Sequence, residues 1–229
     1  MLRSLYDLFS YNPVFEKSEL ERCQGKSVNI DEIGIWDILG YYDGNAPTPS
    51  IHLCEREIED TVSEFYHNRS RFTKLSLRFV VRELVRLHEH AHALIHIGDF
   101  KRFNELVKKY PESYIPPFNN YGSFPPIINE PLTEFISWST ISYLKDTHPY
   151  FLKIFNKIDK KAPHYYREWR RIRKSIDKIN KPITEYIYYI PGLVKIAREN
   201  KWTNFEDFLK EILKNEKILI TIATIYIFM

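Results

Sequence analysis

A His-Glu-x-x-His sequence at residues 88–92 is the stretch of this chain best suited to chemistry. On an α-helix, His88 and His92 lie one turn apart on the same face, so both imidazoles can reach one metal ion. Glu89 lies about 100° further round the helix and can sit beside a metal-bound water without binding the metal. This spacing predicts a zinc hydrolase in which Glu89 is the general base.

A catalytic zinc ion usually has three protein ligands, so the two histidines leave one ligand to be found. His96 would lie about 12 Å along the helix axis from His88, too far to share the ion easily. The extended metzincin pattern fails, because Ile95 and Gly98 occupy its glycine and third histidine positions. Cys54, on an expected strand, is a possible thiolate ligand, but its surroundings do not resemble those in peptide deformylases.

Glu130 and Glu134 are the strongest candidates, at the start of a helix expected from Glu130 to about Asp146. With the His-Glu-x-x-His sequence, this Asn-Glu-Pro-Leu-Thr-Glu element resembles the glutamate helix of gluzincins, the thermolysin-like clan of zinc peptidases. The resemblance covers roughly residues 80–145. It implies that Glu130 is the third zinc ligand and that Glu134 holds a ligand histidine through its second ring nitrogen. Pro131 departs from the family pattern and leaves the choice between the two glutamates open.

The resemblance also implies how peptide hydrolysis would proceed. Glu89 would take the proton of the zinc-bound water and pass it to the leaving amine. The oxyanion needs a hydrogen-bond donor, which a downstream Tyr or His supplies in gluzincins. His164, Tyr165 and Tyr166 are the candidates here, at the start of an expected helix. By fold analogy, the expected strand 51–54 could be an edge strand to which an extended peptide adds.

The elements that must position these residues are mostly helical. We expect an α+β fold in which a small N-terminal β-hairpin or sheet, within about residues 28–54, packs on the active-site helix and the glutamate helix. The active-site helix should span about Ser76 to Ile97, with its buried face made by Val80, Leu84, Leu87, Ala91 and Leu94. Further helices are expected in residues 1–25, 55–67, 100–110, 150–160, from 163 onward, and 203–216.

We expect a single zincin-like domain over residues 1–229, with a catalytic core at about 26–146 and a helical C-terminal extension at 147–229. Residues 111–129 contain five prolines and form a long loop that must bring the two halves of the metal site together. Residues 182–191 are ambiguous between strand and helix.

The composition is that of a globular protein, with 229 residues and 44% hydrophobic content. The formal net charge of +3 is too small to indicate nucleic-acid binding by itself. Cys23 and Cys54 are the only cysteines, and they predict two thiols in a reducing compartment. We expect no signal peptide at the N-terminus. The apolar run 218–229 is shorter than the ~20 residues of a membrane helix, and its length favours a buried strand or core segment.

We therefore expect a cytoplasmic zinc peptidase with Zn2+ as its cofactor and a peptide or protein as its substrate. No membrane partner is expected, and nucleic acid is not favoured. One alternative is a zinc-binding regulatory or interaction protein on a protease-like fold without turnover. Another is a basic helical nucleic-acid-binding protein, which would use a stripe of four cations: Arg167, Arg171, Lys174 and Lys178. Such a stripe is more often just a solvated helix face.

Overall fold

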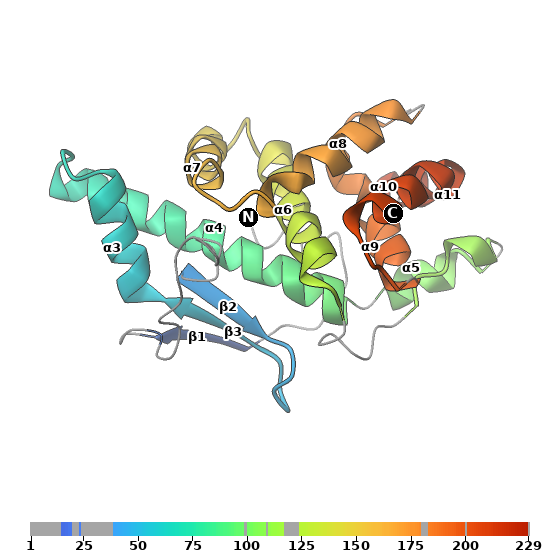
Figure 1. Ribbon diagram of the computed structural model, residues 1–229, viewed down its shortest axis with the longest axis horizontal. Coiled ribbons are helices and arrows are strands. Elements are labelled where there is room, and N and C mark those ends of the chain that lie inside the picture. Colours follow the sequence, from blue (N-terminus) through green and yellow to red (C-terminus); the bar gives the residue numbers. More distant parts are fainter. Residues whose placement is uncertain are drawn as a thin grey trace.

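Figure 1 shows a computed structural model of the chain, in which a small sheet lies against one side of a long helix and further helices cover the other side. The structure describes residues 15–19, 23, 39–98, 100–108, 110–116, 124–179, 183–199 and 201–228. The elements, in chain order, are β1 (Phe15–Glu19), β2 (Gly40–Asp43), β3 (Ser50–Cys54), α3 (Glu55–Phe65), α4 (Arg71–Ile97), α5 (Lys101–Leu106), η1 (Pro111–Ser113), α6 (Pro126–Tyr143), α7 (Pro149–Asp159), η3 (Tyr166–Glu168), α8 (Trp169–Lys178), η4 (Tyr186–Tyr189), α9 (Ile190–Glu199), α10 (Phe205–Lys214) and α11 (Glu216–Ile227). The expected α+β fold, with helix dominating, is confirmed.

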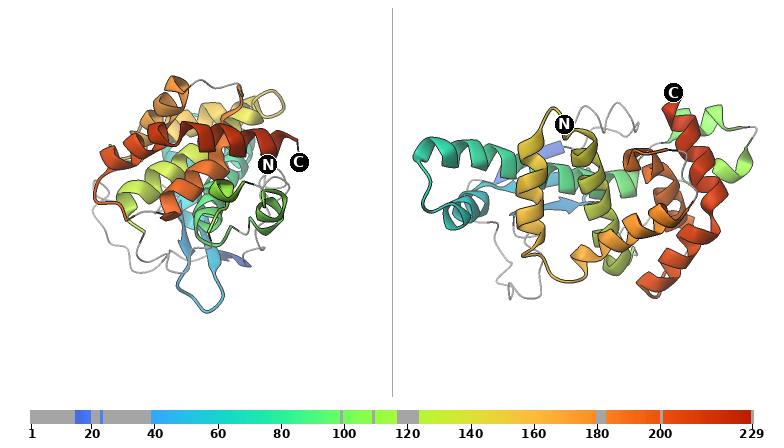
Figure 2. Two further views of the ribbon diagram at one scale, coloured as in Figure 1. Left: turned by 90° about the vertical axis from the view of Figure 1, so that its right-hand side faces the viewer. Right: turned by 90° about the horizontal axis from the view of Figure 1, so that it is seen from above.

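Helix α4 runs along the long axis of the molecule and touches the sheet, α3, α6 and α7 (Figures 1 and 2). It begins at Arg71, earlier than the expected Ser76, because the Ser70 hydroxyl caps it by accepting a hydrogen bond from the Thr73 N–H. It ends at Gly98, as expected. Four of the five apolar residues predicted for its inner face are buried, namely Leu84, Leu87, Ala91 and Leu94. The fifth, Val80, is half-buried.

The sheet has the order β1-β3-β2, so β3 is its central strand. The β2–β3 hairpin is antiparallel, which confirms the expected pairing for residues 40–43, while residues 28–38 lie outside the described part of the chain. Strand β1 pairs with β3 in parallel, from Phe15 opposite Ser50 to Glu19 opposite Cys54. The expectation that residues 51–54 form an edge strand is therefore wrong, because β1 already occupies that side.

Strand β1 corrects a second expectation, since helix was predicted in residues 1–25 and the described part, residues 15–19, is a strand. Contacts distant in sequence hold it there. The Glu16 carboxylate forms hydrogen bonds with two side chains of α4. Its oxygens lie 2.7–2.8 Å from Arg86 Nε and 2.7 Å from His90 Nε2. Ser18 accepts a hydrogen bond from Arg82 at 3.1 Å. The remaining residues of the predicted helical segment lie outside the described part of the chain, apart from Cys23.

Cys23 and Cys54 form a disulfide, with Cα atoms 5.8 Å apart. The prediction of two free thiols is therefore wrong. The bond also removes Cys54 from consideration as a thiolate ligand, because a disulfide sulfur carries no charge for a metal to bind.

Helix α6 begins at Pro126, not at Glu130 as expected. The Pro125 carbonyl accepts hydrogen bonds from the N–H groups of Ile128 and Asn129, so the turn before Glu130 is already helical. Pro131 consequently lies inside the helix rather than at its start. Glu130 thus projects from a formed helix instead of a cap.

The C-terminal helices η4, α9, α10 and α11 gather at the end of the molecule away from the start of α4 (Figure 2). The ambiguous residues near 186–191 are helical, in η4 and the start of α9. The apolar run 218–229 is helix α11 as far as Ile227, so the predicted strand is wrong, although Leu219 and Ile222 do belong to the core. Among the described residues, no helix is long and apolar enough to cross a membrane.

A buried arginine, Arg198 of α9, closes the end of α4. Its guanidinium donates hydrogen bonds of 2.9–3.3 Å to the carbonyl oxygens of Leu94, Ile95, His96, Gly98 and Pro116. The last carbonyls of a helix lack the usual backbone donors, although the Leu94 carbonyl also accepts a hydrogen bond from the Gly98 N–H. A cation at this end also opposes the negative end of the helix dipole. Burial lowers the pKa of Arg198 to about 10, which leaves it charged at neutral pH.

Replacing Arg198 should destabilise the whole fold. Arg198→Met leaves several buried carbonyls unsatisfied, and we expect it to lower the free energy of unfolding in urea by about 2–4 kcal/mol. Lys174→Met, which removes an exposed cation of α8, is the matched control and should change stability by less than about 0.5 kcal/mol. Equal stability of the two variants would contradict this role for Arg198.

The contacts of Glu16 should make stability depend on pH in acid. Burial by itself raises the pKa of Glu16, but the hydrogen bonds from His90 and Arg86 outweigh it and lower the pKa from 4.5 to about 2. A carboxyl group with a lowered pKa stabilises the fold above its unfolded-state pKa and loses that contribution as pH falls through its folded-state pKa. The stability difference between wild type and Glu16→Gln in urea should therefore be largest above about pH 4.5 and shrink toward pH 2. A difference that stays constant across this window would count against the Glu16 contacts.

Candidate metal centre

Three side chains from two helices meet between α4 and α6. His88 Nε2 and His92 Nε2 are 3.2 Å apart, and Glu130 Oε2 lies 3.7 Å from the first and 3.4 Å from the second. All three ligand atoms lie within 4.8 Å of one another. The structure thus brings together the three residues that the sequence predicted as metal ligands.

These separations match those of ligands that share one tetrahedral ion. Zinc–nitrogen bonds of about 2.0–2.1 Å at tetrahedral angles place the ligand atoms about 3.3–3.4 Å apart. The two distances to Glu130 Oε2, 3.7 and 3.4 Å, are longer than the ~2.7–3.2 Å of an N–H···O hydrogen bond, whereas the 3.2 Å between the two imidazole nitrogens is within hydrogen-bond range. Two imidazoles and one carboxylate are also a ligand set that zinc accepts.

The pKa values of His88 and Glu130 suit a cation. Burial lowers the pKa of His88 to about 4, so its imidazole is neutral and has a lone pair available at neutral pH. Burial raises the pKa of Glu130, but His92 and His88 outweigh this and hold it well below its usual range. Glu130 Oε2 is buried and has no hydrogen-bond partner within the described part of the chain. A buried carboxylate oxygen in this position is costly unless a cation or donor meets it, and an ion held by the three residues would do so.

Residues of α6 lie beside the outer ring nitrogens of both histidines. His92 Nδ1 lies 3.3 Å from Asn129 Oδ1 and 3.1 Å from Thr133 Oγ1. With Nε2 facing the cluster, Nδ1–H can donate to these oxygens and fix the ring orientation. Glu134 Oε1 lies 3.8 Å from His88 Nδ1, the ring nitrogen that faces away from the cluster. The sequence did not single out Thr133, although its position one turn after Asn129 on the same helix face was a usable signal.

Of the residues predicted for catalysis, Tyr166 lies beside His88, Glu89 follows His88 on the same helix, and His164 does not meet the cluster. Glu89 is buried beside His88 on α4, with a side chain that faces Gly40 of β2. Tyr166 is fully buried, and its ring centre is 6.3 Å from that of His88. The side chain of His164 is 83% exposed and forms an ion pair with Glu168 at 3.3 Å.

The other histidines of the helix have different partners. His90 bonds Glu16 on the sheet side of α4, and His96 Nδ1 lies 2.9 Å from the Tyr42 hydroxyl of β2. Gly40 permits this close approach of β2, because a Cβ there would lie 2.7 Å from a methyl group of Val85. Neither His90 nor His96 joins the candidate metal ligands, as the sequence predicted.

A second group of residues within metal-binding distance consists of Cys23, Cys54 and Glu57. In the structure its two sulfur atoms are joined to each other as a disulfide. Only reduction would give this group the thiolates that zinc prefers.

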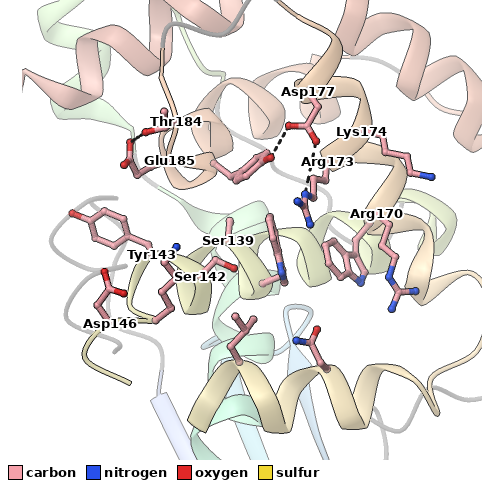
Figure 3. A pocket seen from close by; sticks show the side chains of 16 residues that line it. Ser139, Ser142, Tyr143, Asp146, Arg170, Arg173, Lys174, Asp177, Thr184 and Glu185 are labelled. Carbon is pink, nitrogen blue, oxygen red and sulfur yellow. Dashed lines mark hydrogen bonds and ion pairs between the residues drawn. The ribbon is translucent and has the colours of Figure 1, made fainter. Parts of the chain in front are cut away.

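A large cavity of about 1280 Å3 opens between α6, α7 and α8 (Figure 3). Its wall includes Ser139 and Ser142 from α6 and Arg170, Arg173 and Lys174 from α8. None of the three candidate metal ligands lines it.

The predicted basic stripe on α8 is partly neutralised. Arg171 pairs with both Glu168 and Glu206, and its neighbour Arg170 pairs with Asp159. Lys174 and Lys178 are exposed. These acidic partners reduce the attraction that the stripe could exert on a nucleic-acid backbone.

Zinc binding should distinguish Glu130 from Glu134. Glu134→Gln changes a residue beside a ligand histidine and should lower zinc affinity by ~10–100-fold. Glu130→Gln removes a ligand and should lower zinc affinity far more than that. Competition with a fluorescent chelator measures both values, and Glu64→Gln, at an exposed carboxylate, is the control. A larger effect of Glu134→Gln would assign Glu134 as the ligand and overturn the arrangement described above.

Comparisons with known proteins found no match to this chain among protein-family models, curated proteins or solved structures. The resemblance to gluzincins accordingly rests on the residues themselves: the His-Glu-x-x-His sequence at 88–92 and the glutamates of α6.

Proposed function

We propose that this chain is a zinc-dependent hydrolase that cleaves peptide bonds. The observation that carries the proposal is the meeting of His88 Nε2, His92 Nε2 and Glu130 Oε2 at separations of 3.2–3.7 Å, with Glu89 following His88 on the same helix. When bound there, zinc would lower the pKa of a coordinated water to near 7 and polarise the carbonyl to be attacked.

Glu89 has the role of general base in this proposal. It is next to a ligand in sequence but turned about 100° from it, so its carboxylate serves the reaction and not the ion. It would first act as a base and accept the proton of the attacking water. It would then act as an acid and deliver that proton to the leaving amine. Its side chain is 2% exposed, which separates it from bulk water.

Tyr166 is the donor that we assign to the developing oxyanion. Its ring lies beside His88, whereas the side chain of His164 is in solvent. A phenol O–H aimed at a charge that forms only in the transition state stabilises that state more than the bound substrate. We therefore do not retain His164 as a catalytic residue.

A zinc-binding protein without turnover is the second candidate, and one observation favours it. His88, Glu89 and Tyr166 are all almost fully buried, so a peptide reaches them only if neighbouring segments move. Zinc in such a closed site would hold α4 and α6 together, as structural zinc does.

The cytoplasmic location remains a prediction, and the Cys23–Cys54 disulfide argues against it. Disulfides persist mainly in oxidising environments and are rare in the cytosol.

Glu89→Gln separates the two candidates. In a hydrolase the variant should keep stoichiometric zinc but lose at least about 100-fold in the rate of cleavage of a fluorogenic peptide library. Metal content and cleavage are measured on the same purified sample. Zinc-loaded wild type that cleaves nothing in the library would contradict the hydrolase and favour the structural site.

Tyr166→Phe removes one hydroxyl and should act on the chemical step. We expect kcat to fall by about 10–1000-fold with little change in KM, because the lost hydrogen bond forms only in the transition state. Tyr165→Phe, at the adjacent residue, is the matched control and should keep wild-type kcat. Equal kcat for Tyr166→Phe and wild type would exclude this donor.

A further inference from the structure

The first turns of α4 present large apolar side chains to solvent. Phe72 is 80% exposed, Leu75 57% and Phe79 60%. Their spacing of three and four residues places them on one helix face. Apolar groups clustered in this way mark interaction sites more often than isolated exposed residues do.

Helix α7 extends this apolar face. A hollow of about 500 Å3 lies between the two helices, lined by Phe79 and Val80 of α4 and by Tyr150 and Phe151 of α7. Tyr150 is 72% exposed. With α3, the start of α4 forms one end of the long axis of the molecule, beyond the crossing with α7 (Figures 1 and 2). We call Phe72, Leu75, Phe79 and Tyr150 the apolar end patch.

The segments that carry the apolar end patch are basic. Residues 65–82 contain five Lys or Arg and no Asp or Glu, and residues 147–158 contain two Lys and no Asp or Glu. The acids that face these cations come from α3: Glu55 pairs with Arg78 and Arg82, Glu59 with Arg78, and Glu64 with Lys161. Within the described part of the chain, the cations around the patch that form no ion pair are Arg69, Arg71, Lys74, Lys153 and Lys157, the last of which donates to the Phe65 carbonyl instead.

Two of these cations lie at the start of a helix, where a positive charge does not stabilise the fold. Arg71 and Lys74 lie in the first turn of α4, which contains no acidic residue. The positive end of the helix dipole disfavours cations in this position. An anionic partner at this end of the molecule would offset that cost.

We propose that the apolar end patch docks on a membrane surface that contains anionic lipid. The phenylalanine and leucine side chains would enter the boundary between headgroups and acyl chains, with Tyr150 at the level of the headgroups. Arg71, Lys74 and Lys153 would contact the lipid phosphates and carboxylates. A second copy of the chain is disfavoured as the occupant, because the same cations would meet one another.

This proposal does not require a membrane-spanning segment. The sequence-based expectation of no membrane partner rested on the absence of such a segment, and an amphipathic helix binds a membrane surface without one. The proposal is also independent of the metal site, because the patch lies on the opposite half of α4 from His88.

Sedimentation with lipid vesicles tests the proposal on the full-length chain. Wild type should bind phosphatidylcholine vesicles containing phosphatidylserine more tightly than vesicles of phosphatidylcholine alone, and added salt should weaken binding. Phe72→Ser/Phe79→Ser should reduce binding at least about tenfold through the loss of two inserted rings. Arg71→Gln/Lys74→Gln should remove the preference for phosphatidylserine while leaving the apolar contacts.

Phe228→Ser is the matched control, since Phe228 is 84% exposed and directly follows α11, which lies at the other end of the molecule (Figure 1). It should bind vesicles as wild type does, and urea unfolding verifies that every variant is folded. Absence of wild-type binding, or equal binding by Phe72→Ser/Phe79→Ser, overturns the proposal. So does a wild-type dimer in sedimentation equilibrium that the same double variant dissociates, because a second copy would then cover the patch.

Discussion

The burial of charged and polar groups between α4 and α6 is the constraint on which the rest of the structure depends. His88, His92, Glu130 and Glu134 are placed where helix packing removes water from them. Buried groups of this kind are costly unless each meets a suitable partner. The separations of 3.2–3.7 Å between the inner ligand atoms are those that a tetrahedral ion would produce. Asn129 and Thr133 meet the outer nitrogen of His92, so α6 supplies both a candidate ligand and the support for another.

Such a site requires that α4 keep its position and rotation, and the chain secures both along the length of the helix. Arg198 binds the carbonyls at its end, and Glu16 bonds Arg86 and His90 on its sheet side. The Cys23–Cys54 disulfide joins the chain beyond β1 to the central strand. These contacts come from segments far apart in the sequence, which makes the candidate metal centre a product of the whole fold rather than of one motif.

The candidate metal ligands could be predicted because each depends on helical periodicity. His88 and His92 are one turn apart, and Glu130 and Glu134 repeat that spacing on a second helix. The start of α6 was misplaced because Pro131 resembles a helix-start proline, while Pro126 actually takes that role. The pairing of β1 with β3 and the disulfide depend on contacts between distant segments, for which the local sequence carries no periodic signal. His164 and Tyr166 could not be separated from sequence, because only tertiary packing shows which side chain turns inward.

X-ray absorption at the zinc edge on the purified, zinc-loaded chain tests the central claim most directly. A site made by His88, His92 and Glu130 predicts a first coordination sphere of nitrogen and oxygen at about 2.0–2.2 Å, with the multiple scattering of two imidazole rings. A sulfur shell near 2.3 Å would contradict the claim, since it would place zinc at Cys23 and Cys54 instead. Failure of the purified chain to hold zinc in stoichiometric amount would contradict it equally.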